Sequence, residues 1–132
     1  MKTTKGRVCG GFLSIAWKEA SYEDGSDPNA FLFSLDHRVR LSPNDTNKAV
    51  NLYLANGYGP FFRASLGVRN NFMMNARDNC FCDTDGSAYD NYNVPTDPEG
   101  NSLLTGDGAG KPNNKKTFTL AAIETWSVIY DY

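Results

Sequence analysis

A short apolar run, Ala30-Phe31-Leu32-Phe33-Ser34-Leu35, follows residues 21–29, which are rich in Ser, Asp, Gly and Pro. Those residue types initiate turns, and a run this short has the length of a strand rather than of a helix. Residues 37–41 then alternate between less polar side chains and the arginines Arg38 and Arg40. The pattern predicts an inner strand, a hairpin end directly after it, and a half-exposed strand whose two arginines face water.

Further strands are predicted on both sides of this hairpin. Residues 8–17 alternate so that Gly10, Ser14 and Ala16 lie on one side of an extended segment. The opposite, packed side comprises Cys9, Gly11, Leu13, Ile15 and Trp17. Residues 49–55 and 58–62 are extended candidates joined by Asn56-Gly57, which suits the positive φ angles of a tight hairpin, and residues 64–74 are extended again.

The clearest alternation lies at the end of the chain. One face of that segment is apolar and comprises Phe118, Leu120, Ala122, Trp126, Val128 and Tyr130. Glu124 falls on the same face, where an unpaired carboxylate is costly, so we expect it to point inward and to have a hydrogen-bonding or arginine partner. A ligand contact or an acid–base role is the alternative. Helix signals are weak, and the sequence predicts a mainly β fold, a two-layer antiparallel β-sandwich with few helices.

Residues 75–116 are dominated by Asn, Asp, Gly, Ser and Pro, which predicts a long and mostly irregular connection. Such a connection is unusual in a compact domain. It indicates either a partner-binding surface or a family-specific insertion that packing holds in order.

Composition favours one globular domain over residues 1–132. Hydrophobic residues make up 40% and charged residues 21%, and the net charge of −2 supplies no basic field for nucleic acid. The chain has no apolar run long enough to cross a bilayer and no signal-peptide pattern, so we expect no transmembrane segment and a cytoplasmic location. The three cysteines form no disulfide framework, and we expect them to be reduced.

Motifs for phosphate and calcium fail at particular residues. Gly106-Asp107-Gly108-Ala109-Gly110-Lys111 has Thr105 where a phosphate loop needs its first glycine and Pro112 where it needs Ser or Thr. An EF-hand around Gly86 would place Phe81 and Tyr92 at ligand positions. A looser calcium site on the loop remains open, and its candidate ligands are Asp78, Asp83, Asp85 and Asp90.

Thiol and histidine chemistry has little support in the sequence. Cys80-Phe81-Cys82 leaves only the distant Cys9 and His37 to complete a zinc site, and the pair is redox-sensitive only if it is exposed. His37 is the single histidine, and the sequence has no nucleophile-elbow pattern that would supply it with a catalytic nucleophile. We therefore expect no enzyme activity, no catalytic residue, no cofactor and no resident metal.

Five segments, read in order, resemble the TLDc domain, particularly the versions of unicellular eukaryotes. They are Gly6-Arg7-Val8-Cys9-Gly10-Gly11-Phe12, Trp17, Asp27-Pro28-Asn29-Ala30-Phe31-Leu32-Phe33-Ser34-Leu35, Tyr58-Gly59-Pro60 and Ile123-Glu124-Thr125-Trp126. The resemblance extends from about Lys2 to Tyr130. The family-motif positions that it marks are Gly10, Gly11, Phe12, Trp17, Phe31, Phe33, Leu35, Gly59, Glu124 and Trp126.

The resemblance implies a two-sheet β-sandwich without established enzymatic activity. It also implies a protein-binding module with roles in oxidation resistance and in binding and regulating the V-type proton ATPase. A divalent-metal-binding or carbohydrate-binding β-sandwich is the alternative, suggested by the Asp-rich loop.

Two departures from the family pattern matter. The family's domain begins well upstream of the strand at Val8, so we expect this chain to lack the N-terminal part of the domain, with an exposed edge or apolar face as the consequence. The family usually has a glycine-rich turn at residues 62–68, where this chain has the bulkier Arg63.

Overall fold

The computed structural model describes residues 1–17, 24–51, 58–63, 65–69, 80–82, 91–107 and 117–129. Within them the regular elements are short strands and one turn of 3-10 helix. In chain order they are β1 (Lys2–Thr3), β2 (Cys9–Phe12), β3 (Asp24–Gly25), β4 (Phe31–Ser34), β5 (Val39–Leu41), η1 (Thr46–Lys48), β6 (Val50–Asn51), β7 (Tyr58–Phe62), β8 (Leu66–Arg69), β9 (Cys80–Phe81) and β10 (Leu120–Ala122).

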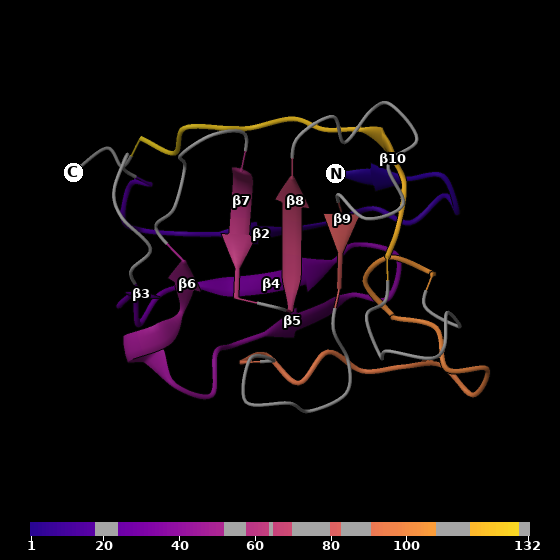
Figure 1. Cartoon of the computed structure of the whole chain (residues 1–132), viewed down its shortest axis with the longest axis horizontal. Coiled ribbons are helices and arrows are strands. Elements are labelled where there is room, and N and C mark those ends of the chain that lie inside the picture. The colour runs from indigo at the N-terminus through magenta and orange to yellow at the C-terminus, as the bar shows by residue number, and fades with distance from the viewer. Residues whose placement is uncertain are drawn as a thin grey trace.

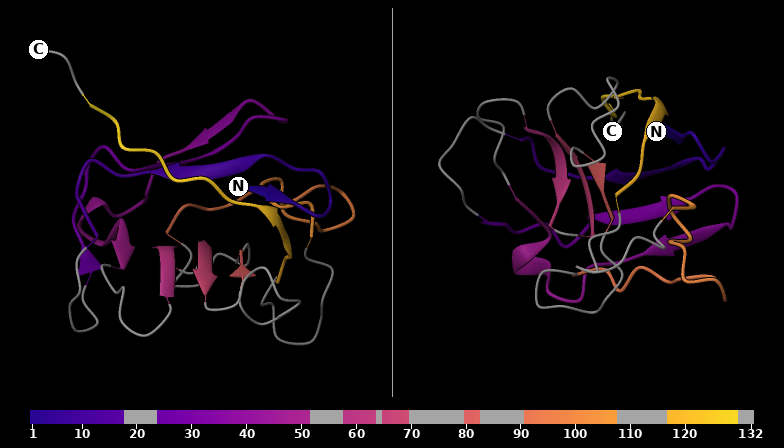
Figure 2. Two further views of the ribbon diagram at one scale, coloured as in Figure 1. Left: turned by 90° about the horizontal axis from the view of Figure 1, so that it is seen from above. Right: turned by 45° about the vertical axis from the view of Figure 1, so that its right-hand side comes forward.

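All the strand pairs described are antiparallel, and they form two three-stranded sheets, β2-β4-β5 and β7-β8-β9, with the smaller pairs β1-β10 and β3-β6. Figure 1 shows β7 and β8 running across the direction of β2 and β4. The left view of Figure 2 shows the two sheets as separate layers. The predicted mainly β, antiparallel architecture with little helix is confirmed.

The apolar run at residues 30–35 forms β4, the central strand of its sheet, as predicted. Leu32 and Ser34 are fully buried toward the second layer, whereas the alternate residues Phe31 and Phe33 are only partly buried. The two arginines that flank Val39 are both exposed, as predicted. The strand period of two therefore divides this sheet into an inner face and an outer face.

The layers meet through residues that the two sheets contribute to one core. Phe62 of β7 lies against Gly11 of β2 so closely that a Cβ atom at position 11 would overlap the ring. Trp17 and Tyr92 pack edge-on against the same ring, with centroids 5.7 and 6.2 Å away. The buried hydrophobic residues are Cys9, Ala30, Leu32, Ala49, Val50, Phe62, Leu66, Val68, Cys80, Cys82, Tyr92, Val94, Leu104, Phe118 and Leu120.

Residues 91–107, part of the long irregular connection, are held by packing. Tyr92 is buried, and its hydroxyl donates to the Ala49 carbonyl at 2.8 Å. The Asn91 side-chain amide donates to the Asp45 and Lys48 carbonyls at 2.9 and 2.8 Å. The sequence predicted either a partner-binding surface or an insertion that packing holds in order. Packing does hold this part of the connection in order.

The segment at residues 8–17 is a shorter strand than predicted. Pairing with β4 covers only Cys9 to Phe12, because the Ser14 backbone N–H donates to the Asp27 carboxylate at 2.6 Å instead of to a neighbouring strand. The predicted facing is nevertheless correct: Leu13, Ile15 and Trp17 pack against the core, whereas Ser14 and Ala16 are exposed.

The prediction for Glu124 is wrong. Glu124 is exposed, and so is Trp126 on the same predicted face, with 81% of its surface accessible. Phe118 and Leu120 are buried as predicted, but β10 ends at Ala122 and the chain then runs along one edge of the molecule without further pairing to the residues described (Figure 1). Alternation identifies the residues that share a face, but burial also needs a neighbouring layer for that face.

The turn between β7 and β8 places Arg63 in the left-handed region, at φ 54°. This conformation favours glycine, the residue type that the family resemblance implies at this turn. Arg63 is buried and forms an ion pair with Asp24 of β3. The larger side chain is thus accommodated by a charged partner on a neighbouring sheet.

Candidate interaction surface

The outer face of the β2-β4-β5 sheet carries a cluster of aromatic and apolar side chains. Register places Gly10 opposite Phe33 and Phe12 opposite Phe31, and Arg40 of β5 lies on the other side of Phe33. Directly cross-strand neighbours point to the same side of a sheet. We call this surface the aromatic face, and it comprises Gly10, Phe12, Phe31, Phe33, Leu35 and Arg40.

The rings of the aromatic face pack on one another. Phe12 and Phe31 stack with centroids 5.2 Å apart and planes inclined by 21°, and Phe31 and Phe33 lie 6.3 Å apart. The Phe33 ring covers Gly10, where a Cβ atom would lie 2.8 Å from Phe33 Cζ. Leu35, just after β4, is 62% exposed. The three partly buried rings are thus joined to one another, and an apolar patch on a protein surface commonly marks an interaction site.

Arg40 supplies the charge of this surface. Its Cζ atom lies 4.0 Å from the Phe31 ring centroid, within the range of a cation–π interaction. The other outward positions of β2, β4 and β5 are glycine and phenylalanine. Sequence reasoning predicted that Arg40 would face water, but its contact with Phe31 depends on strand register, which the pattern alone does not give.

The family-motif positions fall into four places. Five of them, Gly10, Phe12, Phe31, Phe33 and Leu35, belong to the aromatic face. Gly11 and Trp17 lie at the contact between the layers, and Gly59 lies in β7. Glu124 and Trp126 lie on the exposed segment after β10. The structure thus brings half of these positions together on one surface.

Asp27 is a buried carboxylate that sequence reasoning did not single out. Its side chain is fully buried and accepts hydrogen bonds from the Ser14 backbone N–H and hydroxyl, both at 2.6 Å, and from the Asn29 backbone N–H at 2.9 Å. The one sequence feature that could have identified Asp27 is its position as a polar residue just before the apolar run at residues 30–35. These bonds tie the end of β2 to the turn before β4, which is a structural role.

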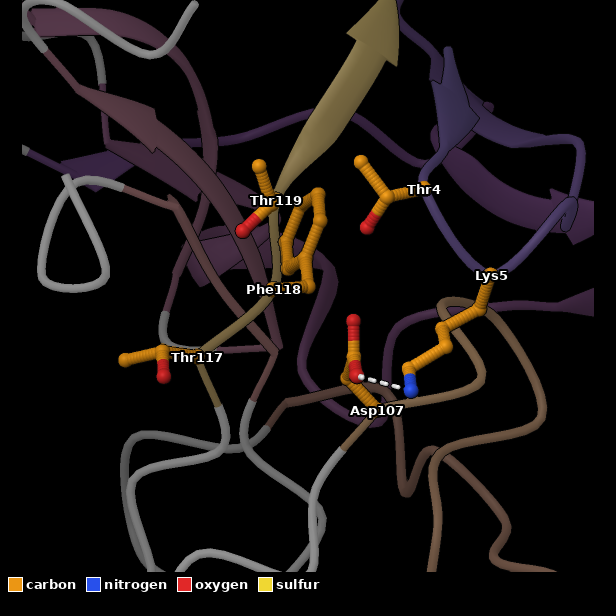
Figure 3. A pocket seen from close by; sticks show the side chains of 6 residues that line it. All are labelled: Thr4, Lys5, Asp107, Thr117, Phe118 and Thr119. Carbon is orange, nitrogen blue, oxygen red and sulfur yellow. Dashed lines mark ion pairs between the residues drawn. The ribbon is translucent and has the colours of Figure 1, made fainter. Parts of the chain in front are cut away.

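A polar pocket of about 330 Å³ lies beside β1 and β10 (Figure 3). Its lining residues are Thr4, Lys5, Asp107, Thr117, Phe118 and Thr119. Burial raises the pKa of Asp107, while Lys5, 4.0 Å away, and a hydrogen bond from the Thr119 backbone N–H oppose that shift. The acid is engaged by an ammonium and an amide, so the pocket offers an ion pair rather than a free acid or base.

The thiols lie in the core. Cys9, Cys80 and Cys82 are all buried and free of disulfides. Burial raises the pKa of the Cys9 thiol to about 11, with Asp36 adding to the shift and the N-terminal ammonium opposing it. Cys82 Sγ lies 3.2 Å from Ser102 Oγ. The condition for redox sensitivity, an exposed thiol, is not met by these cysteines.

The remaining candidate residues do not converge. The His37 backbone N–H donates to Ser34 Oγ at 3.3 Å, and its buried Nε2 atom has no hydrogen-bond partner among the residues described. The candidate calcium ligands Asp78, Asp83, Asp85 and Asp90 lie outside the described residues, as do residues 108–111 of the glycine-rich turn. In the described ranges, no three His, Cys, Asp or Glu residues group as metal ligands, and no helix is long and apolar enough to span a membrane.

Comparison with known proteins supports the resemblance found in the sequence. Residues 1–129 match the sequence profile of the TLDc domain. No curated protein and no solved structure matches the chain.

Proposed function

Since this chain belongs to the TLDc domain family, we propose that it is a non-catalytic protein-interaction module that binds its partner through the aromatic face. The observation that carries the proposal is the stacked cluster of Phe12, Phe31 and Phe33 beside the exposed Leu35. Aromatic residues and arginine are enriched at the energetically important positions of protein interfaces.

The proposed partner is a subunit of the V-type proton ATPase, as the family resemblance implies, and the proposed location is the cytoplasm. Through that partner the protein would regulate the pump and contribute to oxidation resistance. Direct thiol chemistry is a poor alternative explanation, because the three cysteines are buried and a thiol such as Cys9, with a pKa of about 11, stays protonated at neutral pH.

The test is affinity purification of the tagged chain from eukaryotic cells, with quantitative mass spectrometry of the V-type ATPase subunits. Leu35→Asp should abolish their recovery, because it introduces a charge into the apolar patch at an exposed position that the fold tolerates. Trp126→Ser is the matched control, since it removes an exposed apolar side chain elsewhere. Wild-type recovery with Leu35→Asp, or no recovery with the wild type, would contradict the proposal.

The role in oxidation resistance has its own readout. Cells that depend on this protein should survive hydrogen peroxide with the wild type and with Trp126→Ser, and should lose that protection with Leu35→Asp. If Leu35→Asp protects the cells as well as the wild type does, the role in oxidation resistance does not depend on the aromatic face.

A further inference from the structure

The position of Arg40 extends the proposed function to the chemistry of the partner. The guanidinium carbon lies 4.0 Å from the centroid of the Phe31 ring, and Phe31 in turn stacks on Phe12. Among the residues described, Arg40 forms no salt bridge and no side-chain hydrogen bond. Stacking therefore holds a cation in place on the surface while its N–H donors remain available.

We propose that Arg40, held by Phe31, binds a carboxylate of the partner, so that the aromatic face receives an apolar protein segment carrying an Asp or Glu side chain. This inference rests on the proposed function. A planar guanidinium can donate two parallel hydrogen bonds to one carboxylate, which gives both strength and orientation. The surrounding rings and Leu35 match apolar side chains on either side of that acid.

Charge complementarity favours an acidic segment over other occupants. The outward positions of β2, β4 and β5 carry one cation and no acid. A phosphate group would be met by this single arginine within an apolar surface, whereas phosphate sites usually combine several cations or amide donors.

A second copy of the chain fits this surface poorly. In a two-fold dimer each aromatic face would contact the same face of its partner. Two copies of Arg40 would then approach within one interface whose outward strand positions supply no carboxylate, and like charges across an interface are costly. The occupant is therefore a different protein.

The test selects a phage-displayed library of random twelve-residue peptides on the immobilised full chain. The wild type should enrich peptides that combine apolar residues with Asp or Glu. Arg40→Glu should enrich Lys or Arg at the corresponding position, and Leu35→Asp should bind none of the selected peptides. All three are compared by circular dichroism and thermal unfolding, because both substituted side chains are exposed and the variants should remain folded.

A selected peptide is then synthesised with its acid as Glu or as Gln. Wild-type protein should bind the Gln peptide about tenfold more weakly, and Arg40→Gln should bind both peptides equally.

The inference would be overturned if the enriched peptides require Leu35 but carry no acid, or if Arg40→Glu selects the same peptides as the wild type. Either result would leave the aromatic face as a binding site. Without any Leu35-dependent peptide, both proposals fail. Dimerisation of the wild type that Leu35→Asp abolishes, measured by analytical ultracentrifugation, would identify a second copy as the occupant and also overturn the inference.

Discussion

The Phe62 ring of β7 lies directly on the backbone of Gly11 of β2, at the contact between the two sheets. Phe62 is buried and touches Trp17 and Tyr92 edge-on, so the ring has little room to shift. The absence of a side chain at position 11 thus sets how closely the layers approach.

Gly11→Ala should lower the free energy of unfolding by about 1–3 kcal/mol, because the added methyl group overlaps a ring that cannot move away. Gly10→Ala is the matched control on the outer face of the same strand. It meets Phe33, which is only partly buried and can tilt outward, so its cost should be smaller. Urea unfolding of the three proteins measures both effects, and an equal or larger loss for Gly10→Ala would contradict this account of the layer contact.

Asp27→Ala should destabilise the protein by about 2 kcal/mol, because three partly buried hydrogen bonds from Ser14 and Asn29 to the carboxylate are lost. Asp45→Ala serves as the comparison. Asp45 accepts a hydrogen bond from the Asn47 backbone N–H at the start of η1, and its loss should cost about 1 kcal/mol or less. The order of the two losses in urea unfolding is the critical result, and the reverse order would refute the structural role given to Asp27.

Arg63→Gly should destabilise the protein less than Arg63→Ala. Both variants lose the ion pair with Asp24, but glycine adopts the left-handed backbone at position 63 without strain, whereas alanine does not. The expected difference is about 1 kcal/mol in thermal or urea unfolding. Equal stability of the two variants would show that backbone strain at this turn is negligible.

Stability should fall as the pH rises from about 9 to about 11. In this window the unfolded chain loses the Cys9 proton, while the folded protein keeps it because burial raises the pKa from 9.0 to about 11. The unfolded state is therefore favoured by increasing pH. Burial also raises the pKa of Tyr92, which extends the effect toward higher pH.

Melting temperatures measured from pH 7 to pH 11 should decline less steeply for Cys9→Ala than for the wild type. Tyr92→Phe should likewise flatten the alkaline part of the curve, although it also loses the hydrogen bond to the Ala49 carbonyl. Parallel pH profiles for the wild type and Cys9→Ala would mean that the Cys9 thiol has an ordinary pKa in the folded protein.

The sequence predicted the strands better than it predicted which side chains contact one another across the fold. The short apolar run identified the inner strand at residues 30–35, and short-range alternation placed the two arginines outward, because a strand side chain has only two directions available. The same alternation put Glu124 and Trp126 inside, but burial of a face depends on a second layer, which alternation within one segment does not describe.

Long-range contacts explain the rest of what the sequence could not provide. The Arg40 contact with Phe31 needs the register of β4 against β5, and the Asp27 bonds need the end of β2 beside the turn before β4. The hairpin predicted at residues 56–57 lies outside the described residues. The aromatic face itself could be recognised only once the inner side of β4 was known to be buried.

Site-specific photo-crosslinking tests the central claim most directly. Benzoylphenylalanine is placed at position 35 on the aromatic face or at position 126 on the segment after β10, both exposed apolar sites, and each tagged protein is irradiated in cells. The account predicts a crosslinked protein partner from position 35, identified as a V-type ATPase subunit by mass spectrometry, and none from position 126. A partner crosslinked from position 126 and not from position 35 would contradict it.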